Sequence, residues 1–263
     1  MKMRAGFVLV LAFVLGCARP SAFPAGRWLD LSHDFSAETI YWPTAKSFEL
    51  ELVSAGRTPD GFYYAANNFC AAEHGGTHVD APVHFAKDHQ TVDQIPVETL
   101  IGPAVVIDVV KKASANRDYQ ITAGDLLAWE TRHGKIPDRS ILLLHTGQGR
   151  SWPDPLKYLG TARRGPEAVT ELHFPGLHPD AAHWLVTHRK INAIGLDTPS
   201  IDYGQSRLFE SHQILFAKNI PAFENVANLE QLPTTGALVV ALPMKIKGGS
   251  GGPLRIVALV PAR

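Results

Sequence analysis

The second half of the chain alternates between apolar runs and amphipathic stretches. Continuous apolar runs rich in β-branched residues predict buried strands at 103–110, 140–147, 191–198, 237–244 and 254–260. Apolar residues at helical spacing predict helices at 122–134, 178–190 and 211–219. The first helix is expected to begin after a capping Thr122 and to end at Gly134, and the second has Pro179 near its start. This alternation predicts one α/β domain with a mixed sheet and flanking helices.

The first half of the chain is richer in strands. A strand is expected within 27–35, and alternating apolar and polar residues at 47–53 and 62–69 flank a turn, which predicts a β-hairpin. A loop and a short helix are expected over 91–102. Cys70 follows the second hairpin strand among apolar neighbours, so we expect a buried structural thiol there rather than a nucleophile.

The N-terminus has the proportions of an export signal. Lys2 and Arg4 precede the apolar run 5–15, which is too short to span a bilayer. The Val-Leu-Gly-Cys sequence that ends at Cys17 resembles a bacterial lipobox, in which the cysteine is lipidated. The alternatives are a plain secretory signal and a buried first strand of an intracellular protein.

With Cys17 as the end of a lipobox, the sequence predicts a signal peptide at 1–17, a tether at 18–27 and a folded domain at 28–263. Lipidation of Cys17 would rule out an intrachain disulfide, because the chain has only one other cysteine. Ala18, rather than aspartate, follows the cysteine, so the expected location is the periplasmic face of the outer membrane.

The composition excludes several classes of function. Of the 263 residues, 45% are hydrophobic, which is enough for a substantial core. The 25 basic and 25 acidic residues cancel, with no long run of one sign, so neither a nucleic acid nor an anionic membrane surface is expected as a partner. The sequence has no G-x-G-x-x-G after a strand, no P-loop and no G-x-S-x-G, which argues against nucleotide binding and serine-hydrolase chemistry.

Three histidines and an aspartate are clustered in the sequence HGGTHVDAPVHF, which begins at His74. Two glycines and a proline within it disfavour a helix. In an extended chain His74, His78, Asp80 and His84 have the same parity, so a strand would place all four side chains on one face. Two imidazoles and one carboxylate suit zinc, manganese or iron(II) and leave a position open for water. The alternative is a polar strand face with ordinary surface histidines.

This segment resembles the H-x-G-T-H-x-D-x-P-x-H-F signature of the cyclase-like metal hydrolases, which include bacterial kynurenine formamidase and isatin hydrolase. Every fixed position is matched, and LDTPSIDYGQS, SHQILFAKNIPAFENVANL and the Trp-Pro of IYWPT are similar to further family segments. The resemblance covers most of 28–260 and implies the family's swivelling β/β/α fold and a homodimer or larger homo-oligomer. The N-terminal signal and extra residues around 149–167 depart from compact formamidases, which bears on the substrate more than on the chemistry.

The resemblance implies that His74, His78 and Asp80 hold a divalent ion, zinc or manganese. His212 and Glu224 would join the site, with Asp80 bridging to a second ion, so one or two ions per chain are expected. Such an ion activates water as the nucleophile, which accounts for the absence of a serine or cysteine nucleophile motif. The alternative for His212 is a surface position at the start of a helix, and the alternatives for Glu224 are a salt bridge and a surface charge.

Further roles follow from the resemblance. His84 corresponds to the general acid/base, and its alternatives are a further metal ligand or a group that orients one. Thr77 either binds the substrate carbonyl or has a purely structural hydroxyl. Trp42, Phe69 and Phe85 would form an aromatic wall for a flat substrate, although core packing is the alternative for each.

The implied activity is metal-dependent hydrolysis of a small aryl amide. Cleavage of N-formylkynurenine to kynurenine and formate is the leading reaction, and ring opening of a cyclic amide such as isatin is the alternative. A metal-using periplasmic ligand-binding lipoprotein and a structural protein with a vestigial site are hypotheses from other classes, and His84 argues against a pure binding protein. Asp202 is a candidate partner of a site residue, His33 is unassigned, and the loop 248–252 either covers the site or is a plain turn.

Overall fold

A computed structural model describes residues 25–262 of the chain. The predicted signal peptide, Cys17 and most of the predicted tether lie outside the described residues. The folded domain begins with strand β1 (Gly26–Asp30), two residues before the predicted boundary at 28. Within 25–262, no helix has both the length and the apolar character needed to cross a bilayer.

The strands and helices largely follow the predicted pattern. The strands after β1 are β2 (Glu49–Arg57), β3 (Tyr63–Cys70), β4 (His78–Asp80), β5 (Ile101–Asp108), β6 (Gln120–Ile121), β7 (Ile141–His145), β8 (Gly176–Leu177), β9 (Ala193–Leu196), β10 (Ala222–Glu224), β11 (Thr235–Pro243) and β12 (Gly251–Pro261). The α-helices are α1 (Val110–Ala115), α2 (Ala123–His133), α3 (Pro155–Leu159), α4 (Pro179–His188) and α5 (Glu210–Phe216). The loop and helix expected at 91–102 are two short 3₁₀ turns, at Val92–Gln94 and Val97–Thr99, followed by β5.

The main sheet is mixed, as predicted, and it closes on itself. Its strand order is β1-β12-β11-β5-β7-β9-β10-β4, and β4 also pairs with the start of β12. Strands β5, β7, β9 and β10 are parallel, whereas β11, β12 and β4 run antiparallel to their neighbours. The short strand β4 therefore completes a barrel-like closure, with β10 on one side and β12 on the other.

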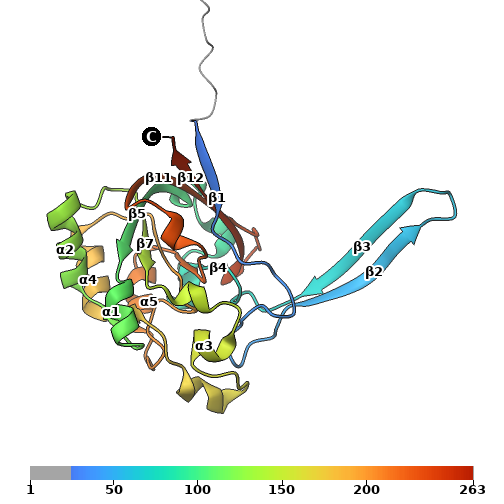
Figure 1. Cartoon of the computed structure of the whole chain (residues 1–263), viewed down its shortest axis with the longest axis horizontal. Helices are drawn as coiled ribbons and strands as arrows, with labels where there is room; N and C mark the ends of the chain where they lie inside the picture. Colours follow the sequence, from blue (N-terminus) through green and yellow to red (C-terminus); the bar gives the residue numbers. More distant parts are fainter. Residues whose placement is uncertain (1–24, 263) are drawn as a thin grey trace, which may run out of the picture.

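The central strands are buried on both faces, which explains their continuous apolar sequences. Along β7, Leu142 and Leu144 pack toward a core that includes residues of α2, α4 and α5, whereas Ile141 and Leu143 pack inside the closed sheet. This alternation follows from the two-residue side-chain period of a strand. Figure 1 shows the helices α1, α2, α4 and α5 grouped on one side of the sheet.

Helix α2 has the predicted ends. Thr122 is its N-cap, and its hydroxyl accepts a hydrogen bond from the backbone N–H of Asp125. The Asp125 carboxylate in turn accepts from the backbone N–H of Thr122 at 2.8 Å, which completes a capping box. The helix ends before Gly134.

The predicted hairpin is formed by β2 and β3, and it projects from the body of the molecule as a long arm (Figure 1). Cys70, at the end of β3, is exposed, so the predicted burial of this thiol is wrong for the single chain. Its apolar neighbour Phe69 lies on the arm rather than in the core. We call β2 and β3, with the turn that joins them, the arm.

Candidate metal centre and cavity

Strand β4 brings the clustered sequence into the centre of the fold. In β10, Glu224 is the cross-strand partner of His78, and in β12, Gly251 is the partner of Asp80. The residues His78, Asp80 and Glu224 are all buried, at 2%, 1% and 4% exposure. Because β4 closes the sheet, these polar groups are held on both sides by backbone ladders.

Only two of the four clustered residues lie on a strand, where parity predicted all four. His78 and Asp80 are in β4, but His74 precedes it and His84 ends a 3₁₀ turn at Pro82–His84. Gly76 turns the chain before β4 with a φ of 58°. The four side chains nevertheless line one cavity, because this turn and the 3₁₀ turn bring His74 and His84 back to it. Their rings are stacked, with centroids 3.8 Å apart.

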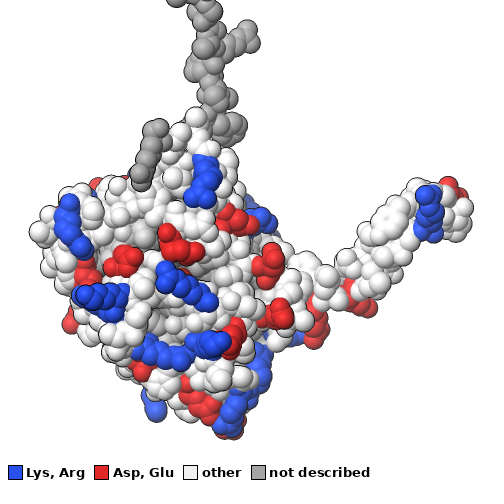
Figure 2. Space-filling view, in the orientation of Figure 1, with Lys and Arg blue, Asp and Glu red and all other residues white. Residues whose placement is uncertain are grey.

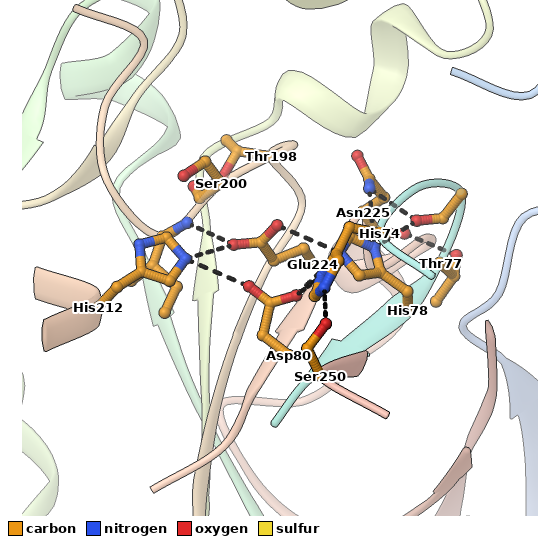
Figure 3. A network of polar contacts seen from close by, with 12 residues as sticks. His74, Thr77, His78, Asp80, Thr198, Ser200, His212, Glu224, Asn225 and Ser250 are labelled. Atoms are coloured by element: carbon orange, nitrogen blue, oxygen red, sulfur yellow. Dashed lines mark hydrogen bonds and ion pairs between the residues drawn. The ribbon is translucent and has the colours of Figure 1, made fainter. Parts of the chain in front are cut away.

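The clustered residues meet His212 from α5. Asp80 Oδ1 lies 2.6 Å from His74 Nδ1 and 3.1 Å from His78 Nε2. Asp80 Oδ2 lies 3.2 Å from His212 Nε2, which is also 3.2 Å from Glu224 Oε1. Figure 3 shows the two carboxylates lying between His212 on one side and His78 on the other.

The arrangement of donors and acceptors fits a cation. His78 Nδ1 lies 3.0 Å from the backbone oxygen of Gly76, and His212 Nδ1 lies 2.5 Å from Asp202 Oδ2. Since these outer partners are acceptors, each ring keeps a proton on its outer nitrogen and directs its inner nitrogen at the carboxylates. A positive charge is needed between that inner nitrogen and the carboxylate oxygens. In the metal-free chain a second proton on the ring supplies it, and a metal ion bound by the same nitrogen would supply it in its place.

Two sets of residues meet the distance requirements for a metal site. His74, His78 and Asp80 form one, and Asp80, His212 and Glu224 form the other, so Asp80 belongs to both. Two imidazoles with one carboxylate, and one imidazole with two carboxylates, are donor sets for divalent transition metals. All five predicted metal ligands are therefore brought together.

The pKa values of the metal-free cluster reflect its buried carboxylates. Burial alone would lower the pKa of His78, but its hydrogen bond to Asp80 and the charges of Asp80 and Glu224 raise it to about 9. Burial would also lower the pKa of His212, but contacts with Asp202, Asp80 and Glu224 raise it well above its ordinary value. Burial, together with the charge of Asp80, raises the pKa of Glu224.

The cavity above the cluster has a volume of about 260 Å³. Trp42, Phe85 and Phe209 are among its lining residues, and the Phe209 ring centroid lies 5.3 Å from that of Phe85 and 6.2 Å from that of Trp42. Two of the three predicted wall residues therefore line the cavity. Phe69 does not line it within the described chain, because it lies on the arm, where it is 54% exposed.

Thr77 lies behind the cluster rather than in the cavity. Its side chain is fully buried, and its hydroxyl donates to the backbone oxygen of Asn225 at 2.7 Å and accepts from the backbone N–H of His33 at 2.9 Å. The structural alternative for Thr77 is therefore favoured, and its assignment to substrate binding is corrected. The hydroxyl connects the turn before β4 to the residue after Glu224.

Three other candidates differ in their relation to the cluster. Asp202 is a direct partner of His212, as noted above. His33 is stacked on Trp152, with ring centroids 4.1 Å apart, and does not line the cavity of the described chain. The loop 248–252 packs against the cluster through Ser250, whose hydroxyl is 2.9 Å from His74 Nε2.

Sequence reasoning missed several residues that complete the site. Phe209 and Asn225 line the cavity, and both have positive φ values, 51° and 53°. Asn225 donates to the backbone oxygen of Gly76 at 2.6 Å and accepts from the hydroxyl of Tyr158 at 2.8 Å. Tyr158 comes from the extra residues near 149–167, so this segment supports the site from behind. The position of Asn225 directly after Glu224 was the only available signal.

Comparisons with known proteins agree with this geometry. The Cyclase family model matches residues 29–203. Isatin hydrolase of Roseibium aggregatum is 36% identical over 210 residues, which cover 77% of this chain and 77% of that protein. Kynurenine formamidase of Salinibacter ruber is 28% identical over 234 residues, which cover 87% of this chain and 95% of that protein.

Among solved structures, isatin hydrolase A from Labrenzia aggregata, bound to benzyl benzoate, superposes with a TM-score of 0.80. The match has 34% sequence identity and covers 90% of this chain and 94% of that chain. The family match, the sequence relatives and the shared fold agree with one another. The chain therefore belongs to the cyclase family of metal-dependent hydrolases.

Proposed function

We propose that the chain hydrolyses the C–N bond of a small, uncharged aryl amide, with ring opening of an isatin-like cyclic amide as the leading reaction. The observation that supports this choice is the lining of the cavity. Its walls include the apolar side chains of Ile40, Trp42, Phe85, Pro199 and Phe209, and within residues 25–262 no lysine or arginine lines it. A flat aromatic ring fits such walls, and an isolated charge does not.

This lining reverses the order of the two candidate substrates. N-formylkynurenine carries a carboxylate and an ammonium group on its amino-acid part, and an unpaired charge is costly to bury in an apolar cavity. Isatin is uncharged, and its two fused rings present flat faces to the aromatic walls. The relative named isatin hydrolase is also the more similar in sequence, at 36% against 28% identity.

The carboxylates and imidazoles of the cluster would hold one or two divalent ions, with zinc and manganese the leading candidates. A bound divalent ion lowers the pKa of water and polarises an amide carbonyl. The residues of the chain then have distinct tasks. Asp80 would supply negative charge to both ligand sets and Glu224 to the set with His212. His74, His78 and His212 would supply directed lone pairs, and the buried surroundings keep these groups fixed.

We assign the proton transfers to His84. Its ring lines the cavity beside His74, but it does not belong to either set of ligand residues. Desolvation by the surrounding protein lowers the pKa of His84 to about 4, although part of the residue is exposed, so the ring is neutral near pH 7. A neutral imidazole accepts the proton that water loses on attack and returns a proton to the departing amine nitrogen.

Cleavage of an N-formyl arylamine is the second candidate. The kynurenine formamidase of Salinibacter ruber matches this chain over 95% of its length, which favours a shared reaction. Two matched pairs of substrates separate the candidates: isatin against isatin-5-sulfonate, and formanilide against N-formylkynurenine. The proposal predicts a higher kcat/KM for the uncharged member of each pair and the highest for isatin. Preference for N-formylkynurenine over formanilide would favour the second candidate, and no turnover on any of them would favour a binding protein.

We also propose a homodimer held together by the arm. The arm exposes large apolar side chains on both strands, with Leu52 66%, Tyr63 68% and Phe69 54% exposed. Figure 2 shows that most of the visible arm surface carries neither positive nor negative residues, which are confined mainly to its tip and its base. A two-stranded hairpin is marginally stable alone in water, so we expect the apolar side chains of the arm to be buried against a partner surface.

Light scattering coupled to size-exclusion chromatography tests the dimer. The wild-type chain should have twice the chain mass, and Leu52→Lys with Tyr64→Lys on the arm should reduce it to one chain. Leu127→Lys with Leu156→Lys is the matched control, because both leucines are exposed apolar residues of helices outside the arm, at 47% and 59% exposure. A monomeric wild-type chain, or loss of the dimer only in the control, would contradict the proposal.

The location is proposed on the sequence alone. A lipid on Cys17 would tether the domain to the periplasmic face of the outer membrane, and the first strand of the described residues, β1, begins nine residues later at Gly26. The enzyme would then act on amides in the periplasm.

A further inference from the structure

Ser250 links the glycine-rich loop between β11 and β12 to the ligand cluster. His74 has two hydrogen-bonding nitrogens, and Nδ1 faces Asp80 at 2.6 Å while Nε2 faces the Ser250 hydroxyl at 2.9 Å. The same hydroxyl lies 2.6 Å from Glu73 Oε2, which also accepts the backbone N–H of Ser250 at 3.0 Å. Figure 3 shows the Ser250 hydroxyl directed at the His74 ring.

The number of available protons determines which group donates in each of these hydrogen bonds. The Glu73 carboxylate can only accept, so the single hydroxyl proton of Ser250 is directed to Glu73. The hydroxyl oxygen must then accept a proton from His74 Nε2. A proton on Nε2 leaves the lone pair of the neutral imidazole on Nδ1, the nitrogen that faces Asp80 and the cluster.

We propose that Ser250 and Glu73 are positioning residues for His74, which hold its ring in the Nε2–H form and direct the Nδ1 lone pair at the metal. This inference rests on the proposed metal site and adds two residues that it had not included. It gives His74 the kind of outer partner that the Gly76 carbonyl gives to His78 and that Asp202 gives to His212. Such partners fix both the tautomer and the orientation of a ligand ring.

The glycines around Ser250 allow this contact. A Cβ atom on Gly251 would lie 2.6 Å from His74 Cε1, and one on Gly249 would lie 2.8 Å from Glu73 Oε1. The backbone is also fixed at this point, because the Ser250 carbonyl accepts the N–H of Ala81 at 2.8 Å. The sequence GGSGG therefore brings one hydroxyl close to a ligand ring, which neither a larger side chain at Gly249 nor one at Gly251 would allow.

The test is zinc affinity, measured by competition with a chelating dye on the purified full chain. Ser250→Ala should weaken zinc binding by about 10- to 100-fold, the usual effect of removing an outer partner of a ligand histidine. Ser250→Thr keeps a hydroxyl and should restore most of the affinity. Glu73→Gln keeps the acceptor oxygen without the charge and should fall between wild type and Ser250→Ala.

Ser32→Ala is the matched control. Ser32 is also half-buried, and its hydroxyl bonds the backbone of Ile256 in β12, away from the cluster. This control should leave zinc affinity unchanged. A spectroscopic measurement separates positioning from stability: ¹⁵N NMR of the zinc-loaded wild type should show His74 protonated at Nε2, and Ser250→Ala should lose or broaden that signal.

The outcomes distinguish this inference from the proposed function. If wild type binds zinc and turns over substrate but Ser250→Ala binds zinc equally well, only the positioning role is overturned. Equal weakening by Ser32→Ala would also overturn it, because the effect would then be one of general stability. If the wild-type chain binds neither zinc nor manganese, the metal site itself is wrong, and this inference with it.

Discussion

Raising the pH should destabilise the metal-free protein, and His78 is the main source of the effect. The Nε2 atom of His78 lies 3.1 Å from Asp80 Oδ1 and 3.5 Å from Glu224 Oε2. These buried carboxylates raise the pKa of His78 from 6.5 to about 9 in the folded chain. Because the folded state binds this proton more tightly, the contribution of His78 to stability is fully present below pH 6.5 and is lost as the pH rises through 9.

The magnitude follows from the two pKa values. At about 1.4 kcal/mol per pH unit, the interval from 6.5 to about 9 corresponds to about 3 kcal/mol of unfolding free energy. The raised pKa of His212 acts in the same direction. The pKa values of His33 and His84 are lowered to about 4, so these groups change the unfolding free energy only below pH 6.5. The pKa of Tyr41 is raised to about 12, so this group changes it only above pH 10. The window between pH 6.5 and 9.5 therefore reports mainly on the cluster.

Urea unfolding in the presence of a chelator, at several pH values from 6.5 to 9.5, measures this loss. The metal-loaded protein should not show it, because bound metal replaces the protons on the ligand histidines. His78→Gln should flatten the dependence, whereas the control His183→Gln, which changes an exposed histidine of α4, should preserve it. If the unfolding free energy of the metal-free protein does not fall over this range, or falls equally in the metal-loaded protein, the buried carboxylates do not stabilise the protonated His78 as inferred.

Four substitutions give further predictions. His78→Ala should lose metal, measured by elemental analysis, and with it all turnover, and full metal retention would show that His78 is not a ligand. His84→Ala should retain metal but lose about 10²- to 10⁴-fold in kcat with little change in KM. The loss in kcat should be smaller with an activated aryl ester, whose leaving group departs without protonation. Loss of metal would instead show that His84 is a ligand. Asp202→Asn should weaken zinc binding by about 10- to 100-fold in a dye competition, and unchanged affinity would rule out its orienting role. Cys17→Ala should move the protein out of the membrane fraction or block its processing, and unchanged mass and fractionation would end the lipoprotein proposal.

The elements that could be predicted are those set by local pattern. The apolar run at 140–147 and the capped helix at 122–134 appear as β7 and α2 with small shifts at their ends. Closure of the sheet could not be predicted, because the three residues of β4 pair with strands far away in the sequence, β10 and β12. Burial of Cys70 was predicted wrongly for a related reason: apolar neighbours indicate burial only when the element that carries them packs on the body.

In the candidate site, too, local pattern predicted some residues correctly, whereas contacts between distant parts of the sequence could not be predicted. Parity correctly placed His78 and Asp80 on one strand, but His84 reaches the cavity through a 3₁₀ turn that parity does not describe. His212 lies 132 residues from Asp80, and only the family resemblance suggested that the two meet. The roles of Thr77 and Ser250 depend on hydrogen bonds to distant backbone and side chains, which no local pattern encodes.

We propose that the five clustered side chains hold the metal on which amide hydrolysis in the apolar cavity depends. The most direct measurement is the rate of isatin ring opening by the purified chain as prepared, after removal of metal by a chelator, and after zinc or manganese is added back. Turnover should disappear when the metal is removed and return with at least one of the two ions. Turnover that survives complete metal removal, or its absence on isatin and on formyl arylamines in the metal-loaded chain, would contradict it.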